Sequence, residues 1–386
     1  MRSFYFDYNA TTPVAKEVLE VFRQALTDGF GNASSIHHLG QAAKQGLETA
    51  RRQVCALIGC NAKELVFGSG GTEADNHALF GAVAGKDKAH IIVSAIEHPA
   101  VLAAASELKR RGHEISIVPV SSEGLVDPGD VQQAIRSNTA LVSVMHVNNE
   151  IGTIQPIEEI AEIAHRAGAL MHSDGVQAVG RMPVNVGDLG VDLYSMSAHK
   201  MRGPKGVGAL FVRKTVSPES LLFGGRHEAG RRAGTENTPG ITAMGHAAHL
   251  ARTQLTSDME RIASLRDRLE QGILDRVPDV TVNGSRSARV SNTTNLCFEG
   301  IEGESLVIAL DLKGFCVSSG SACSSGAVEP SHVLLALGLP KQRAKSSVRF
   351  SLGYGNSAEQ VDELIVAVEE AATHLRRLSP TYIAHV

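Results

Sequence analysis

Residues 141–173 read LVSVMHVNNEIGTIQPIEEIAEIAHRAGALMHS, and this stretch decides the fold class. It opens with a β-branched run, Leu141–Val147, continues through a helix-like stretch, Pro156–Ala167, and returns to an apolar run at Ala169–Ser173. Short apolar runs that alternate with helical stretches are typical of parallel strands, which need a crossover connection between them. The stretch therefore predicts two strands of a mainly parallel sheet that is wrapped by helices.

The same alternation extends on both sides of this stretch, from about Leu65 to Val212. We predict further strands at Leu65–Phe67, His90–Ala95, Ile115–Val120, Leu193–Ser195 and Val207–Val212, and further helices at Glu73–Ala84 and Pro99–Arg111. In sheets of this kind, ligands bind beyond the carboxyl ends of the strands. Candidate site residues are therefore those that directly follow a predicted strand.

A long polar helical stretch, about Ser257–Arg276, then interrupts the alternation. Fewer strands follow it, and the chain ends in an amphipathic helix with apolar residues at helical spacing: Val361, Leu364, Ile365, Val368, Ala372 and Leu375. We predict an α/β protein of two domains. The mainly parallel (mixed) sheet would lie in a large cofactor domain, residues 13–255, and a smaller α+β domain would combine residues 1–12 with 256–386.

The composition limits the classes of function. The 386 residues include 37 Lys and Arg against 41 Asp and Glu, and this net charge of −4 disfavours a nucleic-acid-binding surface. No apolar run approaches the ~18 residues of a membrane span. The first residues lack the apolar core of a signal peptide, so we expect a cytoplasmic protein without membrane contact. Five cysteines without a Cys-x-x-Cys pair indicate neither a disulfide framework nor a metal site.

A glycine-rich turn follows the first predicted strand: Phe67-Gly68-Ser69-Gly70-Gly71-Thr72-Glu73. Its exposed amides and the dipole of the helix that follows would hold a phosphate group. Glu73 stands where a dinucleotide-binding fingerprint needs its third glycine, and no Gly-Lys-Ser/Thr follows as in a Walker A loop. A purely structural left-handed turn is the alternative for this segment.

Two more polar residues follow predicted strands. Asp174 comes directly after Ala169–Ser173, where it either faces a ligand or caps the next helix. Lys200 follows the strand Leu193–Ser195, where it is either a Schiff-base amine or a surface lysine. A phosphate cradle, a carboxylate beside the pyridinium nitrogen and a Schiff-base lysine are together what pyridoxal 5'-phosphate requires. Their conjunction on one sheet predicts a site for this cofactor.

Several longer motifs are spread over nearly the whole chain, from Phe6 to Gly353. They are Phe6-Asp7-Tyr8-Asn9-Ala10-Thr11-Thr12-Pro13, Gly31-Asn32, Glu97-His98-Pro99, His146-Val147-Asn148-Asn149-Glu150-Ile151-Gly152, Ser197-Ala198-His199-Lys200, Arg231-Arg232-Ala233-Gly234-Thr235, Ser319-Gly320-Ser321-Ala322-Cys323-Ser324 and Val348-Arg349-Phe350-Ser351-Leu352-Gly353. In these motifs the sequence resembles the NifS/IscS-type cysteine desulfurases of the class V aminotransferase family. The resemblance implies the fold of the type I pyridoxal phosphate enzymes.

The resemblance also implies a role for each matching residue. Lys200 would form the Schiff base, Asp174 would pair with the pyridine nitrogen, and Gln177 would bond the ring hydroxyl. His98 would stack on the ring and assist proton transfers. The phosphate would be held by Gly71, Thr72, Ser197 and His199, together with Thr235 from the second subunit of a homodimer. The substrate carboxylate would be bound by Asn149 and Arg349, and Asn149 would also touch the cofactor.

The catalytic thiol that the resemblance implies is Cys323. Every residue from Ser318 to Ala327 is small, so we expect a movable loop that carries a reactive thiolate to the cofactor and then presents the sulfur outside. The other four cysteines, Cys55, Cys60, Cys297 and Cys316, have apolar neighbours in the sequence and are expected in the core.

Residues and resemblance together predict a homodimeric cysteine desulfurase that converts L-cysteine to L-alanine and leaves a persulfide on Cys323. The sulfur would pass to an acceptor protein, an iron–sulfur scaffold or a sulfur relay, for iron–sulfur cluster or thio-cofactor and tRNA synthesis. There are two alternatives: selenocysteine lyase activity, and a sulfur-relay or assembly subunit that is active only with a partner. A plain class V aminotransferase would have no use for Cys323. Alanine release from cysteine by the purified protein alone would separate an enzyme from a partner-dependent subunit.

Overall fold

Seven strands form the central sheet of the structure, a computed structural model that describes residues 3–319, 329–379 and 382. In their spatial order they are β2 (Leu65–Gly68), β8 (Gly208–Val212), β7 (Leu193–Ser197), β6 (Leu170–Asp174), β5 (Thr139–Ser143), β3 (His90–Ser94) and β4 (Glu114–Val118). All neighbours from β7 to β4 are parallel, whereas β8 runs antiparallel to both β7 and β2. The predicted mainly parallel, mixed sheet is confirmed.

Helices cover both faces of this sheet, because successive side chains of each strand point to opposite sides. Leu65 and Phe67 of β2 face one apolar core together with side chains of α2, α6 and the first half of α7. Val66 faces a second core together with side chains of α3 and α4. The helices are α2 (His38–Ile58), α3 (Gly71–Val83), α4 (Pro99–Arg110), α6 (Ile157–Arg166) and α7 (Thr238–Arg276). This arrangement leaves the carboxyl edge of the parallel strands open for a ligand.

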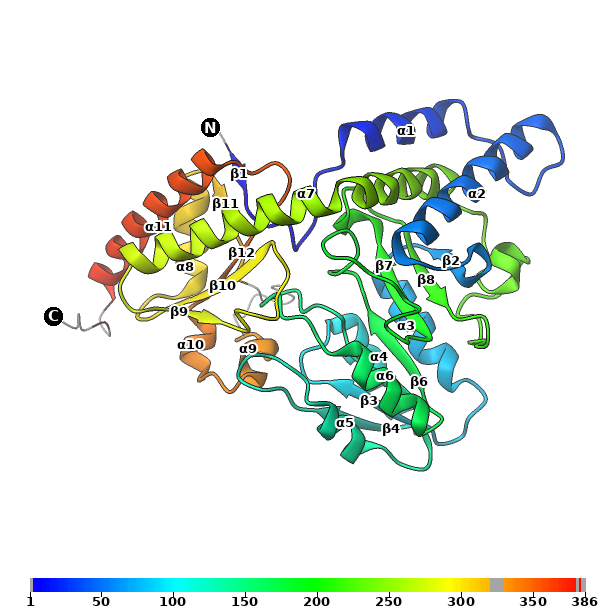
Figure 1. Ribbon diagram of the computed structural model, residues 1–386, viewed down its shortest axis with the longest axis horizontal. Coiled ribbons are helices and arrows are strands. Elements are labelled where there is room, and N and C mark those ends of the chain that lie inside the picture. The colour runs from blue at the N-terminus through cyan, green and yellow to red at the C-terminus, as the bar shows by residue number, and fades with distance from the viewer. Residues whose placement is uncertain (1–2, 320–328, 380–381, 383–386) are drawn as a thin grey trace.

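The smaller part of the molecule lies around the C-terminal half of α7 (Figure 1) and has an apolar core of its own. Its antiparallel sheet has the order β12-β10-β9 and packs against α8, α11 and the second half of α7. A short parallel pair, β1 with β11, brings the N-terminal segment into this part. The elements are β1 (Phe4–Tyr5), β9 (Val280–Asn283), β10 (Thr293–Phe298), α8 (Gly303–Leu312), β11 (Phe315–Cys316), β12 (Ser347–Ser351) and α11 (Ala358–Leu378).

Helix α7 begins about twenty residues earlier than the sequence predicted. Asn237 caps its first turn, since the side-chain oxygen accepts a hydrogen bond of 3.1 Å from the Gly240 amide. Its 39 residues span roughly 58 Å, so Met244 packs in the large core while Leu269 packs in the small one. The predicted domain boundary at residue 255 falls inside this continuous helix, and the division into domains stays a prediction.

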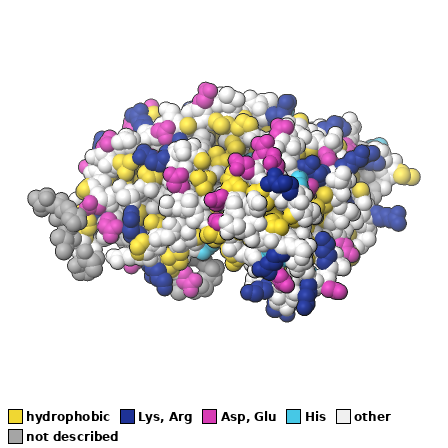
Figure 2. All heavy atoms as spheres, turned by 60° about the horizontal axis from the view of Figure 1, so that its bottom comes forward, with side chains coloured by type: hydrophobic (Ala, Val, Ile, Leu, Met, Phe, Trp, Pro, Cys, Tyr) yellow, Lys and Arg dark blue, Asp and Glu magenta, His cyan; other side chains and the backbone are white. Residues whose placement is uncertain are grey.

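The remaining elements lie around these two parts. They are α1 (Lys16–Thr27), α5 (Pro128–Ala134), α9 (His332–Ala336), α10 (Lys341–Lys345) and the short 3-10 helices η1 (Ala62–Glu64), η2 (Ala198–Lys200) and η3 (His227–Gly230). In the part of the chain that the structure describes, no helix has the length and apolar character needed to cross a membrane. Acidic and basic side chains are interspersed on the face that Figure 2 shows.

Candidate active site

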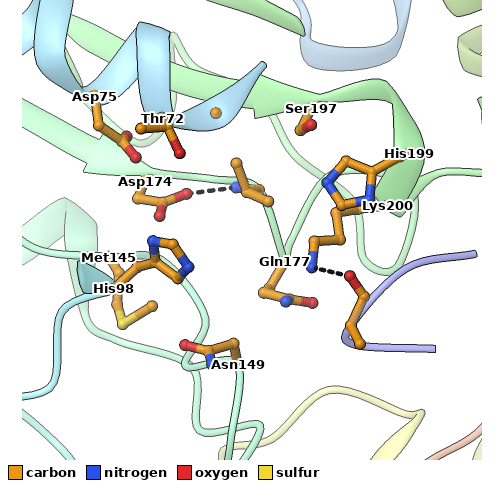
Figure 3. A pocket seen from close by; sticks show the side chains of 13 residues that line it. Thr72, Asp75, His98, Met145, Asn149, Asp174, Gln177, Ser197, His199 and Lys200 are labelled. Carbon is orange, nitrogen blue, oxygen red and sulfur yellow. Dashed lines mark hydrogen bonds between the residues drawn. The ribbon is translucent and has the colours of Figure 1, made fainter. Parts of the chain in front are cut away.

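A cavity of about 280 Å³ opens at the carboxyl edge of the large sheet. Its walls come from the ends of β6 and β7, the N-terminus of α3, the segment after β3 and the N-terminal segment of the chain (Figure 3). The lining residues are Ala10, Gly71, Thr72, Asp75, His98, Met145, Asn149, Asp174, Val176, Gln177, Ser197, His199 and Lys200. Nine of the residues singled out in the sequence therefore share one cavity: Gly71, Thr72, His98, Asn149, Asp174, Gln177, Ser197, His199 and Lys200.

Asp174 is the last residue of β6 and is 4% exposed. Its Oδ1 accepts a hydrogen bond of 2.9 Å from the Val176 amide, so it shapes the turn after the strand while it also lines the cavity. Burial raises the pKa of Asp174, whereas His98, the Val176 amide and Lys200 act in the opposite direction. A cationic or hydrogen-bond-donating ligand atom in the cavity would therefore stabilise the carboxylate.

Lys200 ends η2, the short turn that follows β7. Its Nζ donates to the main-chain oxygens of Asn9, at 2.5 Å, and Ala10, at 2.8 Å, which belong to the N-terminal segment. Burial and the nearby charges of Arg181 and Arg349 lower the pKa of Lys200 to about 7. Near neutral pH a large share of this amine is unprotonated, which is the form that attacks a carbonyl carbon.

His98 precedes α4 and caps its first turn, since Nδ1 accepts a hydrogen bond of 3.1 Å from the Ala100 amide. A neutral imidazole that accepts at Nδ1 carries its proton at Nε2. Partial desolvation by the cavity walls lowers the pKa of His98, and Asp174 opposes this shift. The side chain is accessible from the cavity, so it can contact a bound ring or exchange a proton at Nε2.

Backbone amides at the start of α3 and the side chains of Thr72, Ser197 and His199 form the polar corner of the cavity (Figure 3). Amides at a helix N-terminus and neutral donors favour an anion. His199 Nδ1 lies 3.1 Å from the Thr11 hydroxyl, and burial lowers the pKa of His199 to about 4.

The glycines of this corner are required for space. A Cβ at Gly71 would lie 2.8 Å from Val176 Cγ2, and one at Gly208 would lie 2.6 Å from the Gly70 Cα. Gly70 has a φ of 158° and a ψ of −174°, a conformation that L side chains rarely adopt, but it is not the left-handed turn that was the alternative for this segment.

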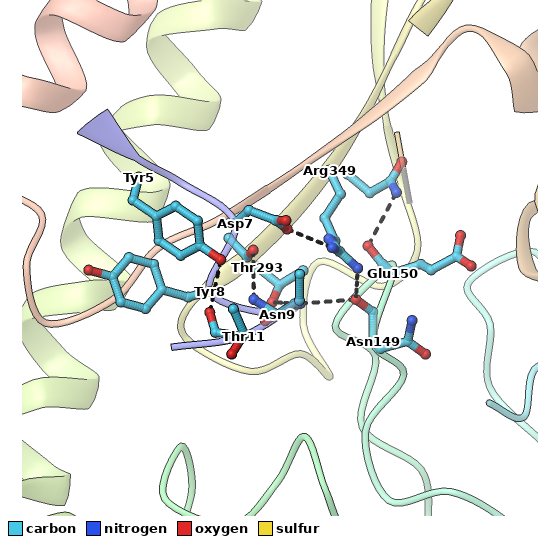
Figure 4. Close-up of polar contacts among 12 residues, drawn as sticks. Tyr5, Asp7, Tyr8, Asn9, Thr11, Asn149, Glu150, Thr293 and Arg349 are labelled. Carbon is cyan, nitrogen blue, oxygen red and sulfur yellow. Dashed lines mark hydrogen bonds and ion pairs between the residues drawn. The ribbon is translucent and has the colours of Figure 1, made fainter. Parts of the chain in front are cut away.

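Arg349, on β12, adjoins the cavity through Asn149 (Figure 4). Its Nη1 donates to the Asn149 main-chain oxygen at 2.9 Å, while the Asn149 side chain lines the cavity. Its Nη2 forms an ion pair of 2.7 Å with Asp7, and the side chain is only 5% exposed. A solvated arginine at a strand edge is therefore excluded, and the guanidinium lies where a substrate carboxylate could replace one of its present partners.

Of the other predicted residues, Arg349 adjoins the cavity without lining it, and Thr235 lies apart from it. Thr235 is exposed and lines a separate hollow with Gly206 and Arg232. Cys323 lies outside the described residues. Of the other cysteines, Cys55 and Cys297 are buried, but Cys60 and Cys316 are only partly buried, so the expectation that all four lie in the core was wrong for these two.

Sequence reasoning missed two groups at the site. Asp75 lines the cavity from α3, where its spacing of three from Thr72 on one helix face was the available signal. Burial and the neighbouring Asp174 raise the pKa of Asp75 well above its ordinary value. Arg181 contacts Gln177 from behind, and its spacing of four from that residue was the signal.

The donor set of the cavity fits pyridoxal 5'-phosphate. A phosphate would lie at the polar corner, a pyridinium nitrogen at the buried carboxylate of Asp174, and an aldehyde carbon within reach of the Lys200 amine. The Gln177 amide and the His98 ring would border the pyridine ring.

Comparisons with known proteins agree with a site for pyridoxal 5'-phosphate. The model of the aminotransferase class-V family matches residues 4–364. A cysteine desulfurase IscS of Dictyoglomus turgidum is 47% identical over 382 residues, which are 98% of this chain and 97% of that protein. A cysteine desulfurase IscS of Methanosarcina thermophila is 46% identical over 381 residues, 98% of this chain and 94% of that protein.

Solved structures with the same fold cover almost the whole chain. A NifS-like protein superposes with a TM-score of 0.91 at 35% identity, over 97% of this chain and 100% of that chain. The structure titled "SspA in complex with cysteine" has a TM-score of 0.82 at 34% identity, over 90% of this chain and 98% of that chain.

The fold and the relatives define a pyridoxal-phosphate-dependent α/β enzyme. More narrowly, the chain belongs to the class V aminotransferase family, and its relatives include the two proteins named cysteine desulfurase IscS and the NifS-like protein.

Proposed function

We propose that this protein is a pyridoxal-phosphate-dependent cysteine desulfurase, which converts L-cysteine to L-alanine and transfers the sulfur to Cys323. The observation that carries the proposal is that the Lys200 amine and the Asp174 carboxylate line one cavity, with Arg349 placed behind Asn149 at its side. Near-complete coverage by relatives named cysteine desulfurase supports the same reaction.

Four residues at or beside the cavity have tasks in this proposal. Arg349 and Asn149 bind the carboxylate of L-cysteine, and the neutral amine of Lys200 accepts the proton that leaves the substrate Cα. Asp174 holds a proton at the pyridine nitrogen, since a buried carboxylate is stabilised by a cationic partner. When bound, the cofactor supplies the electron sink for the negative charge that develops at Cα.

Sulfur transfer requires a nucleophile that attacks the substrate sulfur. The thiolate of Cys323 forms the new S–S bond, and the Cβ–S bond breaks with its electron pair left on the carbon skeleton. Protons delivered at carbon, with His98 and Lys200 as the nearby carriers, complete L-alanine. The sum is one L-cysteine and one thiol giving one L-alanine and one persulfide, so no external oxidant is needed.

The proposal includes a homodimer in which Thr235 reaches the phosphate corner of the partner subunit. Thr235 is exposed and lies apart from the cavity of its own chain. Large apolar side chains are exposed in the segment between α1 and α2, where Phe30 is 67% and Ile36 is 93% exposed. This segment and the Thr235 segment border one surface hollow, which Ala33 and Glu236 both line. Burial of such side chains drives association.

A sulfur-acceptor protein completes the proposed cycle, because the enzyme turns over only when the persulfide is removed. An iron–sulfur scaffold and a sulfur relay both have the chemistry of such an acceptor. The cytoplasmic location expected from the sequence stays a prediction.

The test is alanine release from L-cysteine by the purified protein, compared with a Cys323→Ser variant. A serine hydroxyl is a poor nucleophile toward sulfur, so the variant should bind the cofactor and L-cysteine but release no alanine. Cys60→Ser and Cys316→Ser are matched controls, since both thiols are partly buried, and each should keep wild-type rates. Normal alanine release by Cys323→Ser, or an extra sulfur atom found by mass spectrometry only on another cysteine, would refute the proposal.

A further inference from the structure

Arg181 is a buried cation to which the proposed reaction gives no task. It follows β6 in the chain, and its side chain is 9% exposed. Nη1 donates to Oε1 of Gln177, and Nη2 donates to the Tyr8 main-chain oxygen at 2.8 Å. Among the described residues no carboxylate forms an ion pair with it. A buried guanidinium without an anion is costly, so a structural role alone does not explain its charge.

The contact with Gln177 decides which way that amide points. A guanidinium has five N–H donors and no acceptor, so the Gln177 atom that faces Arg181 must be the oxygen. The amide nitrogen then lies on the other side, where one N–H donates to the Asn9 main-chain oxygen at 3.0 Å. Because Gln177 lines the cavity, its second N–H is the group that remains for a ligand.

We propose that Arg181 is a positioning residue of this site: it holds the oxygen of Gln177, so that the amide offers the cavity an N–H donor and never an acceptor. The ligand atom selected at this point is an oxygen that accepts a hydrogen bond. On the proposed function, on which this inference rests, that atom is the ring hydroxyl oxygen of pyridoxal phosphate, held in its ionised form.

The charge of Arg181 acts in the same direction on the neighbouring amine. Lys200 is faced by two cations, Arg181 and Arg349, and by two carboxylates, Asp174 and Asp7. After burial, Arg181 makes the largest contribution that lowers the pKa of Lys200. Positive charge behind Gln177 therefore favours both an unprotonated amine and an ionised ligand oxygen in the cavity.

The experiment measures binding of pyridoxamine 5'-phosphate to the apoprotein by isothermal titration. This probe has the ring hydroxyl and the phosphate but no aldehyde, so its affinity does not depend on bond formation with Lys200. Arg181→Met should weaken binding about tenfold, as for loss of a hydrogen bond to a charged group. Arg181→Lys, which still donates and keeps the charge, should restore most of the affinity.

A double-mutant cycle with Gln177→Ala shows whether Arg181 acts through that amide. In the Gln177→Ala background the effect of Arg181→Met should largely disappear. A second readout is the pH titration of the absorbance of bound pyridoxal phosphate, whose midpoint should move to higher pH in Arg181→Met and return toward the wild-type value in Arg181→Lys.

Unchanged probe affinity in Arg181→Met, or the same loss with and without Gln177, would overturn the inference. If Arg181→Met does not fold, the same cycle with Arg181→Gln decides. A glutamine at position 181 can donate to the Gln177 oxygen or accept from the Gln177 nitrogen, so it cannot fix the orientation of the Gln177 amide. Failure of the wild-type apoprotein to bind both pyridoxamine 5'-phosphate and pyridoxal phosphate would instead refute the proposed function.

Discussion

At the scale of single residues, the protonation state of Lys200 decides whether the cavity can capture a carbonyl compound. Its pKa of about 7 lies far below the ~10.4 of a lysine in solution. Below pH 7 the amine is mainly protonated and unreactive, and above pH 7 it is mainly a free base. Reactivity of Lys200 should therefore rise as the pH passes through about 7 and then level off.

Competitive labelling of the apoprotein with a small amine-reactive reagent tests this first prediction. The peptide that carries Lys200 should show a labelling midpoint near pH 7, read by mass spectrometry. Lys205, five residues on and exposed, is the internal reference for reagent decay and access. A midpoint for Lys200 at the pH typical of free lysine would contradict the prediction.

The residue scale also shows what the sequence could and could not provide. Asp174 and Lys200 were predictable because one ends β6 and the other lies in the turn after β7, and the carboxyl edge of a parallel sheet gathers such residues. The main-chain carbonyl groups that hold Lys200 and the neighbouring side chains of Gln177 and Arg181 were not predictable. Arg181, Gln177 and Lys200 donate to the successive main-chain oxygens of residues 8–10, a segment more than 165 positions away in the chain. No local pattern reports such a contact.

At the scale of elements, the turn after β6 has no room for a larger residue at Gly175. A Cβ there would lie 2.0 Å from Cζ of Tyr194, a side chain on β7 with no exposed surface. The Tyr194 hydroxyl also bonds Nδ1 of His146 at 2.8 Å, so the ring cannot shift without breaking a buried hydrogen bond. Gly175→Ala should destabilise the protein by about 1–3 kcal/mol, as overpacking of a core does.

Urea denaturation followed by circular dichroism measures this second prediction. Gly46→Ala in α2 is the matched control, since the only atom near its added Cβ is the Thr242 hydroxyl at 3.3 Å. In a helix this exchange is neutral or stabilising by about 0.5–1 kcal/mol. Equal unfolding midpoints for the two variants would show that the Tyr194 ring can move freely.

A second pair of elements, β12 and the N-terminal segment, holds the proposed carboxylate-binding group. Arg349 is fixed between Asp7 and the Asn149 main chain (Figure 4), so its planar fork is already oriented before substrate arrives. Arg349→Lys keeps the charge but loses the two-point grip on a carboxylate. We expect the KM for L-cysteine to rise about tenfold or more, with the absorbance of the bound cofactor unchanged.

Steady-state kinetics at several L-cysteine concentrations provide the measurement for Arg349→Lys. Arg268→Lys, which alters an exposed ion pair with Asp362, is the control and should leave KM unchanged. An unaltered KM in Arg349→Lys would assign substrate binding to another residue.

Helix α7 shows where prediction from sequence ended at this scale. All seven strands of the large sheet were predicted, because their apolar runs are separated by turns and helices. The start of α7 was missed because its first half is rich in Gly and Ala. These small residues pack closely, but they give little difference in hydrophobicity between the two faces of a helix. Thr242 and Gly245 in this half contact α2, so the packing of another helix, rather than local propensity, fixes the helix there.

At the scale of the whole molecule, the proposed homodimer would place Thr235 of one subunit at the phosphate corner of the other. Thr235 is exposed and lies apart from the cavity, in a segment anchored by an ion pair of 2.8 Å between Arg232 and Glu73. A closed two-fold dimer makes each subunit complete the other, because the same surface is used twice. Thr235→Asp should then weaken phosphate binding in the partner subunit, since it adds like charge at the phosphate.

Mixing two impaired variants tests this dimer arrangement directly. In a mixed dimer of Thr235→Asp and Lys200→Ala chains, the first subunit keeps its own Lys200 and receives an intact Thr235 from its partner. At a cofactor concentration too low to saturate Thr235→Asp, alanine release should therefore rise above that of either variant alone after the two proteins are co-refolded. Lys200→Ala mixed with Asp174→Ala is the contrasting pair. Both residues line the cavity of their own chain, so each subunit of this mixed dimer has one altered cavity residue and no alanine should be released. Recovery confined to the second mixture, or none in the first while light scattering shows mixed dimers, would contradict the assignment of Thr235 to the partner's site.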